Sequence, residues 1–237
     1  MFCDFQRRFD PQLILILPDF CCVGSHPVKQ ISNAKQRLSP FLSKEERRDF
    51  FSAMLEDVLS MMVKIDFFKK IILATNCPHA ISIAGRHGIT HFETGPDDGL
   101  NQAAGETVNH LLENGIRDMF LIPADIPMIT EEEINSVLKA HPSAPSLTII
   151  PSRDKLGSNC ILLSPPSMMP FKFGPDSYFR HLEIAQSNGL KINPMELSGF
   201  GLDIDKPTDL FELLKLKGDT RSQKYLQELN KLKKFAY

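Results

Sequence analysis

The alternation of apolar strand-like runs with amphipathic helical segments is the feature that most constrains the fold of this 237-residue chain. Such a pattern is typical of a mostly parallel sheet with helices on both faces. We expect strands at 70–75, 90–93, 119–122, 147–150, 160–163 and 201–204, and helices at 44–64, 78–86, 99–114, 130–140, 176–187 and 220–234. The sequence therefore predicts an α/β fold whose ligands bind beyond the carboxyl ends of the strands.

Several helix boundaries are marked by specific residues. Ser43 with Glu46, and Thr130 with Glu133, have the spacing of capping boxes, in which each side chain bonds the backbone of the other residue. Pro207 suits the first turn of a further helix. These signals place the loops that precede the helices, where functional side chains are expected.

Composition and charge exclude several classes of protein. Apolar residues make up 42% of the chain, charged residues 24%, and the net charge is -2, so no overall basic surface for nucleic acid is expected. The apolar run at 13–17 is too short for a secretory signal, and none approaches the ~20 residues of a membrane span. We expect a cytoplasmic protein with no nucleic-acid or membrane partner. Its five cysteines, which form no C-x-x-C pair, are expected to be reduced thiols.

A lone carboxylate, Asp125, follows the apolar run at 119–122. One interpretation is that it caps the next helix. Thr130 and Glu133 already supply that cap, which favours a metal-binding or catalytic role at the strand end.

Two further carboxylates, Asp203 and Asp205, lie two positions apart in the predicted strand at 201–204 and its continuation. In a strand they would share one face about 6.5 Å apart, and at an effective dielectric of about 20 they would repel by roughly 2.5 kcal/mol. A cation between them removes that penalty, and oxygen ligands suit Mg²⁺, which also takes substrate phosphates. The alternative is that Asp205 caps the helix at Pro207 while Asp203 is merely exposed.

Three cations precede the long helix at 44–64. They are Lys29, Lys35 and Arg37. They form either a solvated basic loop or a clamp for a triphosphate, in which the lysines act as point charges and the arginine as a fork.

Three short polar segments are candidate ligand sites. Ser158 lies in a small turn before a strand, and Gly174 and Ser177 open a helix whose free N–H groups favour phosphate or carboxylate. Asn101 follows Gly99 and Leu100 in a segment that is either a plain helix start or a nucleotide-contacting turn.

Together and in this order, these segments resemble the 2-phospho-L-lactate guanylyltransferase family of coenzyme F-420 biosynthesis, which includes phosphoenolpyruvate and 3-phospho-D-glycerate guanylyltransferases. The resemblance covers about Pro27 to Leu214. The segments that carry it read PVKQISNAKQRLSPFLSKEERRDFFSAMLEDVL, GLNQA, LIPADIPMIT, GSNCILL, FGPDSYFRHL and LDIDKPTDL.

The resemblance implies a single-domain fold of the nucleotide-diphospho-sugar transferase type, with a mixed, mostly parallel sheet. It implies transfer of GMP from GTP to a small phosphorylated acid with release of pyrophosphate. Carried over by position, Asp125, Asp203 and Asp205 would hold Mg²⁺. Ser158, Gly174 and Ser177 would hold the acid, and Lys29, Lys35, Arg37 and Asn101 would act on the nucleotide side. Ser158 stands where the family often has threonine.

The N-terminus departs from the family pattern, in which a short apolar strand runs directly into the PVK turn. Either Leu13–Leu17 is the first strand and an inserted loop follows it, or Phe20–Val23 is the first strand. We expect this extension over 1–26, the catalytic domain over 27–218 and a terminal helix over 219–237, which packs on its own domain or on the neighbour's in a homodimer.

Two alternative functions stay open on these residues. One is another nucleotidyltransferase, of the sugar or molybdenum-cofactor type, although the glycine-rich N-terminal loop of those enzymes is not found here. The other is a non-catalytic nucleotide-binding protein on the same fold, against which the three carboxylates argue.

Overall fold

The computed structural model describes residues 13–17, 35–93 and 99–229. Its strands are β1 (Leu13–Leu17), β2 (Ile71–Ala74), β3 (Thr90–Phe92), β4 (Met119–Pro123), β5 (Ser146–Pro151), β6 (Ser158–Ser164) and β7 (Lys191–Pro194). Its helices are η2 (Gln36–Leu38), α2 (Lys44–Met62), α3 (Pro78–Arg86), α4 (Gly99–Glu113), α5 (Glu131–Ala140), η3 (Pro166–Met168), α6 (Ser177–Ser187), α7 (Ser198–Gly201), α8 (Pro207–Lys215) and α9 (Arg221–Glu228).

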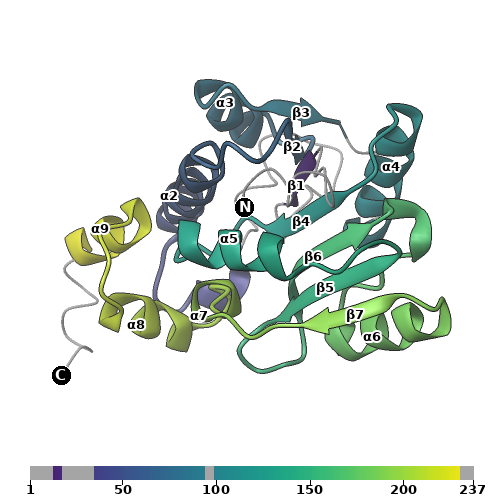
Figure 1. The fold of residues 1–237 in the computed structure, drawn as a ribbon. Coiled ribbons are helices and arrows are strands. Elements are labelled where there is room, and N and C mark those ends of the chain that lie inside the picture. The colour runs from purple at the N-terminus through teal and green to yellow at the C-terminus, as the bar shows by residue number, and fades with distance from the viewer. Residues whose placement is uncertain (1–12, 18–34, 94–98, 230–237) are drawn as a thin grey trace.

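The strands form one sheet in the order β3-β2-β1-β4-β6-β5-β7 (Figure 1). All neighbouring pairs are parallel except those of β6, which runs antiparallel to both β4 and β5. The mixed, mostly parallel sheet predicted from the sequence is confirmed. Because β6 runs in the opposite direction, its first residues lie beside the carboxyl end of β4.

Helices cover both faces of the sheet, as predicted (Figure 1). Side chains alternate along β4, so that Phe120 and Ile122 pack on one face and Met119 and Leu121 on the other. The first face is covered by α2, α3, α5, α7, α8 and α9, and the second by α4 and α6. All five residues of β4 are buried, which fits a central strand.

Leu13–Leu17 forms β1 and lies between β2 and β4 in the middle of the sheet. Of the two candidates, Leu13–Leu17 is therefore the first strand of the sheet. Phe20–Val23 lies outside the described residues. The domain boundaries proposed at 26 and 218 stay predictions.

The sequence missed β7, an edge strand whose residues are exposed or half-buried. It carries neither an apolar run nor a clear alternation, so nothing in its composition distinguishes it from a loop. Among the described residues no helix is both long and apolar enough to cross a membrane.

The start of α5 differs from the predicted capping box. Thr130 Oγ1 accepts a hydrogen bond from Glu133 N at 3.2 Å, as expected, but the Glu133 carboxylate accepts from Gly199 N at 2.8 Å. A Cβ atom at Gly199 would lie 2.2 Å from Glu133 Oε2 and 2.4 Å from the carbonyl oxygen of Met128. Only glycine fits there, and this contact ties α7 to α5.

Helix α9 packs on α2 of the same chain through a buried carboxylate. Asp57 on α2 accepts hydrogen bonds from Arg221 N at 2.8 Å, Ser222 N at 2.9 Å and Ser222 Oγ at 2.7 Å. Burial raises the pKa of Asp57, and these donors act in the opposite direction. The carboxylate thus satisfies the amides that open α9.

We expect Asp57→Ala to lower the free energy of unfolding by about 2–3 kcal/mol, because buried donors lose their acceptor. Urea unfolding measures the change. Asp49→Ala on the same helix is the matched control, because the Asp49 side chain is 47% exposed, and it should change stability by less than about 0.5 kcal/mol. Equal effects of the two substitutions would contradict the role of Asp57.

Candidate active site

The carboxyl end of β4 delivers Asp125 into the interior. Its side chain is fully buried, and its backbone oxygen accepts a hydrogen bond from Ile204 N at 3.1 Å. That bond brings the segment 203–205 against the end of β4. The sequence expectation that Asp125 and the two later aspartates come together is therefore met in space.

Lys35 supplies a buried cation to this cluster. Its ammonium forms ion pairs with Asp125 and with Asp205 Oδ1, the latter at 2.5 Å, although the lysine is only 2% exposed. The backbone of Lys35 has φ 53°, a left-handed conformation that costs a non-glycine residue about 1 kcal/mol or more. Arg37, two residues on in η2, is exposed, and Lys29 lies outside the described residues.

The segment 201–204 is not a strand, and that prediction was wrong. Gly201 ends α7, and its backbone oxygen accepts from Arg153 N at 2.8 Å, while Ile204 N bonds Asp125. The backbone bonds of the segment go to separate loops and not to one neighbouring strand. The separation of about 6.5 Å expected between Asp203 and Asp205, which assumed a strand, therefore does not apply.

The alternative reading of Asp205 as the cap of α8 is also wrong. The helix begins at Pro207 with Lys206 as its N-cap, and the capping carboxylate belongs to Asp209. Asp209 Oδ2 accepts from Asp205 N at 3.0 Å and from Lys206 N at 2.7 Å. The side chain of Asp205 is thereby left to pair with Lys35.

Asp203 completes the acidic cluster. Its Oδ1 accepts a hydrogen bond from Asn159 Nδ2 at 3.0 Å. Burial raises the pKa of Asp203 to about 6, and the charges of Asp125 and Asp205 add to that rise. A nearby positive charge would relieve this repulsion and favour the ionised form of Asp203.

Hydroxyl groups lie next to this cluster because β6 begins there. Asn159 faces Asp203, and the preceding Ser158 faces α6, where its Oγ lies 2.9 Å from His181 Nδ1 and accepts from Ser177 Oγ at 3.4 Å. Ser158 was expected in a turn, but it is the first residue of β6. The consecutive residues Ser158 and Asn159 thus connect the carboxylates to the buried hydroxyl groups of Ser158 and Ser177.

The start of α6 is less open than the sequence suggested. Gly174 has φ +117°, which favours glycine, and its oxygen accepts from Ser177 N at 3.1 Å. Tyr178 N donates to Leu156 O at 3.1 Å. Two amides that we expected to be free for an anion are therefore engaged within the chain. An anion here would meet the hydroxyl group of Ser158, to which Ser177 Oγ donates.

Asn101 connects α4 to the segment that precedes α6. Its Nδ2 donates to Phe173 O at 3.2 Å, and its Oδ1 accepts from Phe173 N at 2.6 Å. The amide thus clamps the backbone next to Gly174. A nucleotide contact by Asn101 stays a prediction.

The chemistry of the cluster fits a magnesium ion, whose preferred ligands are carboxylate oxygens. No group of three or more His, Cys, Asp or Glu side chains in the described ranges has the geometry to hold a metal ion. The Lys35 ammonium instead provides positive charge to Asp125 and Asp205. Holding a metal would therefore require Lys35 and the carboxylates to rearrange.

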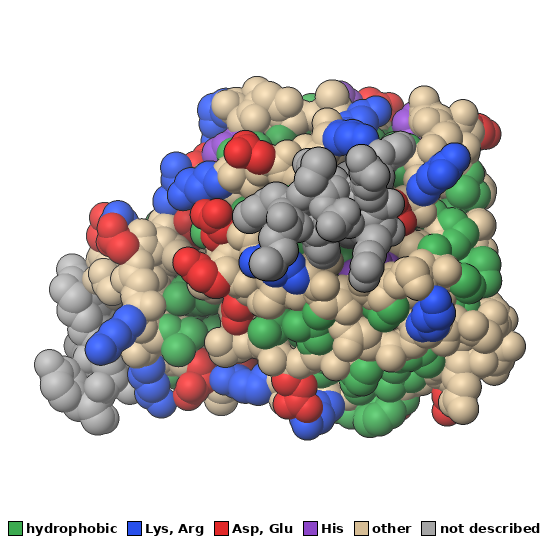
Figure 2. Space-filling model, in the orientation of Figure 1, with side chains coloured by type: hydrophobic (Ala, Val, Ile, Leu, Met, Phe, Trp, Pro, Cys, Tyr) green, Lys and Arg blue, Asp and Glu red, His purple; other side chains and the backbone are tan. Residues whose placement is uncertain are grey.

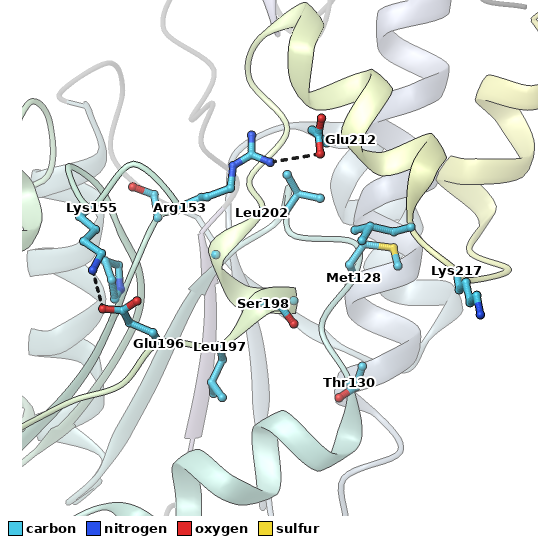
Figure 3. A pocket seen from close by; sticks show the side chains of 15 residues that line it. Met128, Thr130, Arg153, Lys155, Glu196, Leu197, Ser198, Leu202, Glu212 and Lys217 are labelled. Atoms are coloured by element: carbon cyan, nitrogen blue, oxygen red, sulfur yellow. Dashed lines mark hydrogen bonds and ion pairs between the residues drawn. The ribbon is translucent and has the colours of Figure 1, made fainter. Parts of the chain in front are cut away.

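A cavity of about 560 Å³ is lined in part by Leu202, the residue before Asp203 (Figure 3). Its lining includes Met128, Leu202, Arg153 and Lys155 but not the aspartate cluster. Arg153 pairs with Glu212 at 3.8 Å, and Lys155 pairs with Glu196 at 2.7 Å (Figure 3). Two of the cations that line the cavity are thus paired with carboxylates of the same lining.

On the face shown in Figure 2, basic and acidic side chains are interspersed, and the described residues form no continuous basic stripe. This agrees with the net charge of -2.

Sequence reasoning missed His181 and Asn159, which organise the site. His181 follows Ser177 by four positions on α6, so both side chains lie on one helix face. That spacing was the available signal. Asn159 adjoins Ser158, and the alternation of a strand sends its side chain to the opposite face.

The fold defines a class, the nucleotidyltransferase-like α/β folds. A solved structure assigned as a nucleotide-diphospho-sugar transferase of Desulfovibrio desulfuricans matches with a TM-score of 0.73 at 16% identity, covering 96% of this chain and 99% of that one. A cytidylyltransferase of Leptospira borgpetersenii matches with a TM-score of 0.54 at 10% identity, covering 96% and 95%. At these identities the likeness concerns the fold.

Sequence comparison gives the family. The profile described as guanylyl transferase CofC like matches residues 24–235, and the chain belongs to this family. A phosphoenolpyruvate guanylyltransferase of Sphaerobacter thermophilus is 32% identical over 79% of this chain and 89% of its own. A 3-phospho-D-glycerate guanylyltransferase of Colwellia psychrerythraea is 34% identical over 89% and 97%, and a 2-phospho-L-lactate guanylyltransferase of Methanosphaera stadtmanae is 28% identical over 86% and 88%.

Proposed function

We propose that this chain transfers GMP from GTP to a small phosphorylated acid and releases pyrophosphate, as a step of coenzyme F-420 biosynthesis. The acid would be phosphoenolpyruvate, 3-phospho-D-glycerate or 2-phospho-L-lactate, because similar relatives carry each of these names. Family membership supports the reaction class. The choice among the three acids is left to experiment.

The observation that carries the proposal is the juxtaposition of two half-sites at the end of β4. Lys35 and the aspartate cluster form one half, and Ser158 with Ser177 forms the other. The consecutive residues Ser158 and Asn159 join them. Nucleotide phosphates and an anionic acceptor could thus be held next to each other.

The reaction needs little acid–base help from the protein. A phosphate oxygen of the acid attacks the α-phosphorus of GTP, a new P–O bond forms, and pyrophosphate leaves with the electron pair of the broken bond. Since the nucleophile is already an anion, catalysis consists of positioning and charge neutralisation. Lys35, together with Lys29 and Arg37, would neutralise charge on the triphosphate.

Asp125, Asp203 and Asp205 would hold Mg²⁺, which would supply charge neutralisation to the phosphates when bound. Lys35 pairs with two of these carboxylates in the described structure. We propose that the Lys35 ammonium turns from the carboxylates to the nucleotide phosphates when Mg²⁺ and GTP are both bound. Asn101 would hold Phe173 and thereby the loop beside the acceptor.

Incubation of the purified protein with GTP, Mg²⁺ and each of the three acids tests the proposal. We expect pyrophosphate and a GMP–acid conjugate with at least one acid, and neither product without an acid. Release that is independent of the acid would indicate simple GTP hydrolysis and would count against the transfer reaction.

We expect Ser177→Ala to raise the acceptor KM about tenfold with little change in the KM for GTP, because one buried hydroxyl near the acid is lost. Steady-state kinetics with each substrate varied in turn measure both constants. Ser187→Ala at the exposed end of the same helix is the matched control and should change neither. An unchanged acceptor KM in Ser177→Ala would tell against the hydroxyl site.

A further inference from the structure

His181 lies at the centre of the acceptor half-site although it is fully buried. Its Nε2 accepts a hydrogen bond from Lys172 N at 2.9 Å, and its Nδ1 lies 2.9 Å from Ser158 Oγ. One imidazole therefore joins three elements: helix α6, the loop before it and the first residue of β6. Nothing in the reaction as described above uses this histidine.

The contacts of His181 determine its tautomer. A backbone N–H can only donate, so the bond from Lys172 requires a lone pair on Nε2. Burial lowers the pKa of His181 to about 4, which keeps the ring neutral near pH 7. A neutral ring with a bare Nε2 carries its proton on Nδ1, and Nδ1–H therefore donates to Ser158 Oγ.

This tautomer controls what the Ser158 hydroxyl can do. A serine oxygen has two acceptor positions and one proton to donate. One acceptor position takes the hydrogen of His181 Nδ1, and the other takes that of Ser177 Oγ at 3.4 Å. The remaining capacity of Ser158 is donation, which matches an oxygen of a phosphate or carboxylate and no donor group.

Aromatic rings hold the imidazole in this position. Phe173 and Phe171 stand edge-on to His181, with centroids 5.1 Å and 6.2 Å away. Ser158 keeps 8% exposure, whereas Ser177 has 2% and His181 none. The serine is thus the member of the cluster that reaches an incoming ligand, and the histidine supports it from behind.

We propose that His181 is a positioning residue that fixes the Ser158 hydroxyl as a hydrogen-bond donor to the anionic acceptor. The proposal rests on the proposed function, because it assumes that the acid binds at Ser158. It predicts that His181 affects binding of the acid and not of GTP.

Two substitutions separate the two nitrogens of the ring. His181→Asn places an amide N–H near the position of Nδ1 and keeps the donor to Ser158, whereas His181→Gln places an acceptor near Nε2 and keeps the bond to Lys172. Each variant loses one hydrogen bond. We expect the acceptor KM of His181→Gln to exceed that of His181→Asn about tenfold, with equal KM values for GTP.

His141 provides the matched control at the other end of β6. It is also a histidine whose pKa burial lowers to about 4, and its ring bonds Thr148 at 2.8 Å and Ser164 at 3.0 Å. We expect His141→Asn and His141→Gln to lower the melting temperature. Their acceptor KM values should be equal. Equal acceptor KM values for the two His181 variants would overturn the proposal.

The nitrogen-15 spectrum of the wild-type protein tests the tautomer without any variant. We expect a protonated Nδ1 and a bare Nε2 at His181, and the opposite tautomer would overturn the proposal even if both variants failed to fold. Wild-type kinetics distinguish failure of the proposed function from failure of the role proposed for His181. No transfer to any acid removes the proposed function and this proposal with it. Wild-type transfer with indistinguishable His181 variants removes this proposal alone.

Discussion

Replacement of Asp125 by asparagine is expected to reduce GMP transfer by about a hundred- to a thousandfold while leaving the fold intact. The loss of one charge-stabilising group in a buried site typically costs this much in turnover. The fold should survive because asparagine keeps the size of the side chain, the backbone bond from Ile204 N remains, and Lys35 keeps Asp205 as its partner.

Pyrophosphate release measures the turnover of Asp125→Asn, and circular dichroism with thermal melting measures its fold. Asp118→Asn is the matched control. Asp118 is a buried aspartate that directly precedes the first residue of β4, and its Oδ1 accepts a hydrogen bond from Ser164 Oγ at 2.5 Å. We expect this control to lose stability and to keep its turnover per folded molecule. Unfolding of Asp125→Asn, or unchanged turnover, would contradict the assignment.

The second large effect is expected from Lys35→Met, which should lower the free energy of unfolding by about 3–5 kcal/mol. Removing one partner of a buried ion pair leaves the other charges uncompensated, and here Asp125 and Asp205 lose their buried cation. Methionine is apolar and of similar length, so the change isolates the charge. Urea unfolding measures the loss.

Magnesium gives this variant a second readout. If the carboxylates bind Mg²⁺, the ion should raise the melting temperature of Lys35→Met more than that of the wild type, because it restores the missing positive charge. Lys70→Met, at an exposed position, is the control and should change neither stability nor the response to Mg²⁺. Identical Mg²⁺ responses in Lys35→Met and the wild type would argue that the cluster is held by Lys35 alone.

The fold was predictable where local signals and burial agree. The apolar run at 119–122 became β4, and the cap at Thr130 began α5 at Glu131, because each depends on neighbouring residues. The prediction failed at 201–204, where the backbone bonds go to Arg153 and Asp125. Those partners are distant in sequence, and a local pattern contains no information about them.

The site was predictable in its residues and less so in its geometry. The position of Asp125 at the end of a buried strand indicated that it belongs to the site. The spacing of Asp203 and Asp205 indicated the segment that contacts it. The left-handed turn that buries Lys35 among them has no local signal in the sequence. His181 escaped notice because a histidine on a helix face is ordinary until its two ring nitrogens are seen to bond separate elements.

The measurement that tests the central claim most directly is acid-dependent release of pyrophosphate by the wild-type protein with GTP and Mg²⁺. The proposed function predicts release in equal amounts with a GMP–acid conjugate for at least one of phosphoenolpyruvate, 3-phospho-D-glycerate and 2-phospho-L-lactate. It also predicts no release when the acid is omitted. Absence of both products with all three acids, from protein shown to be folded, would contradict it.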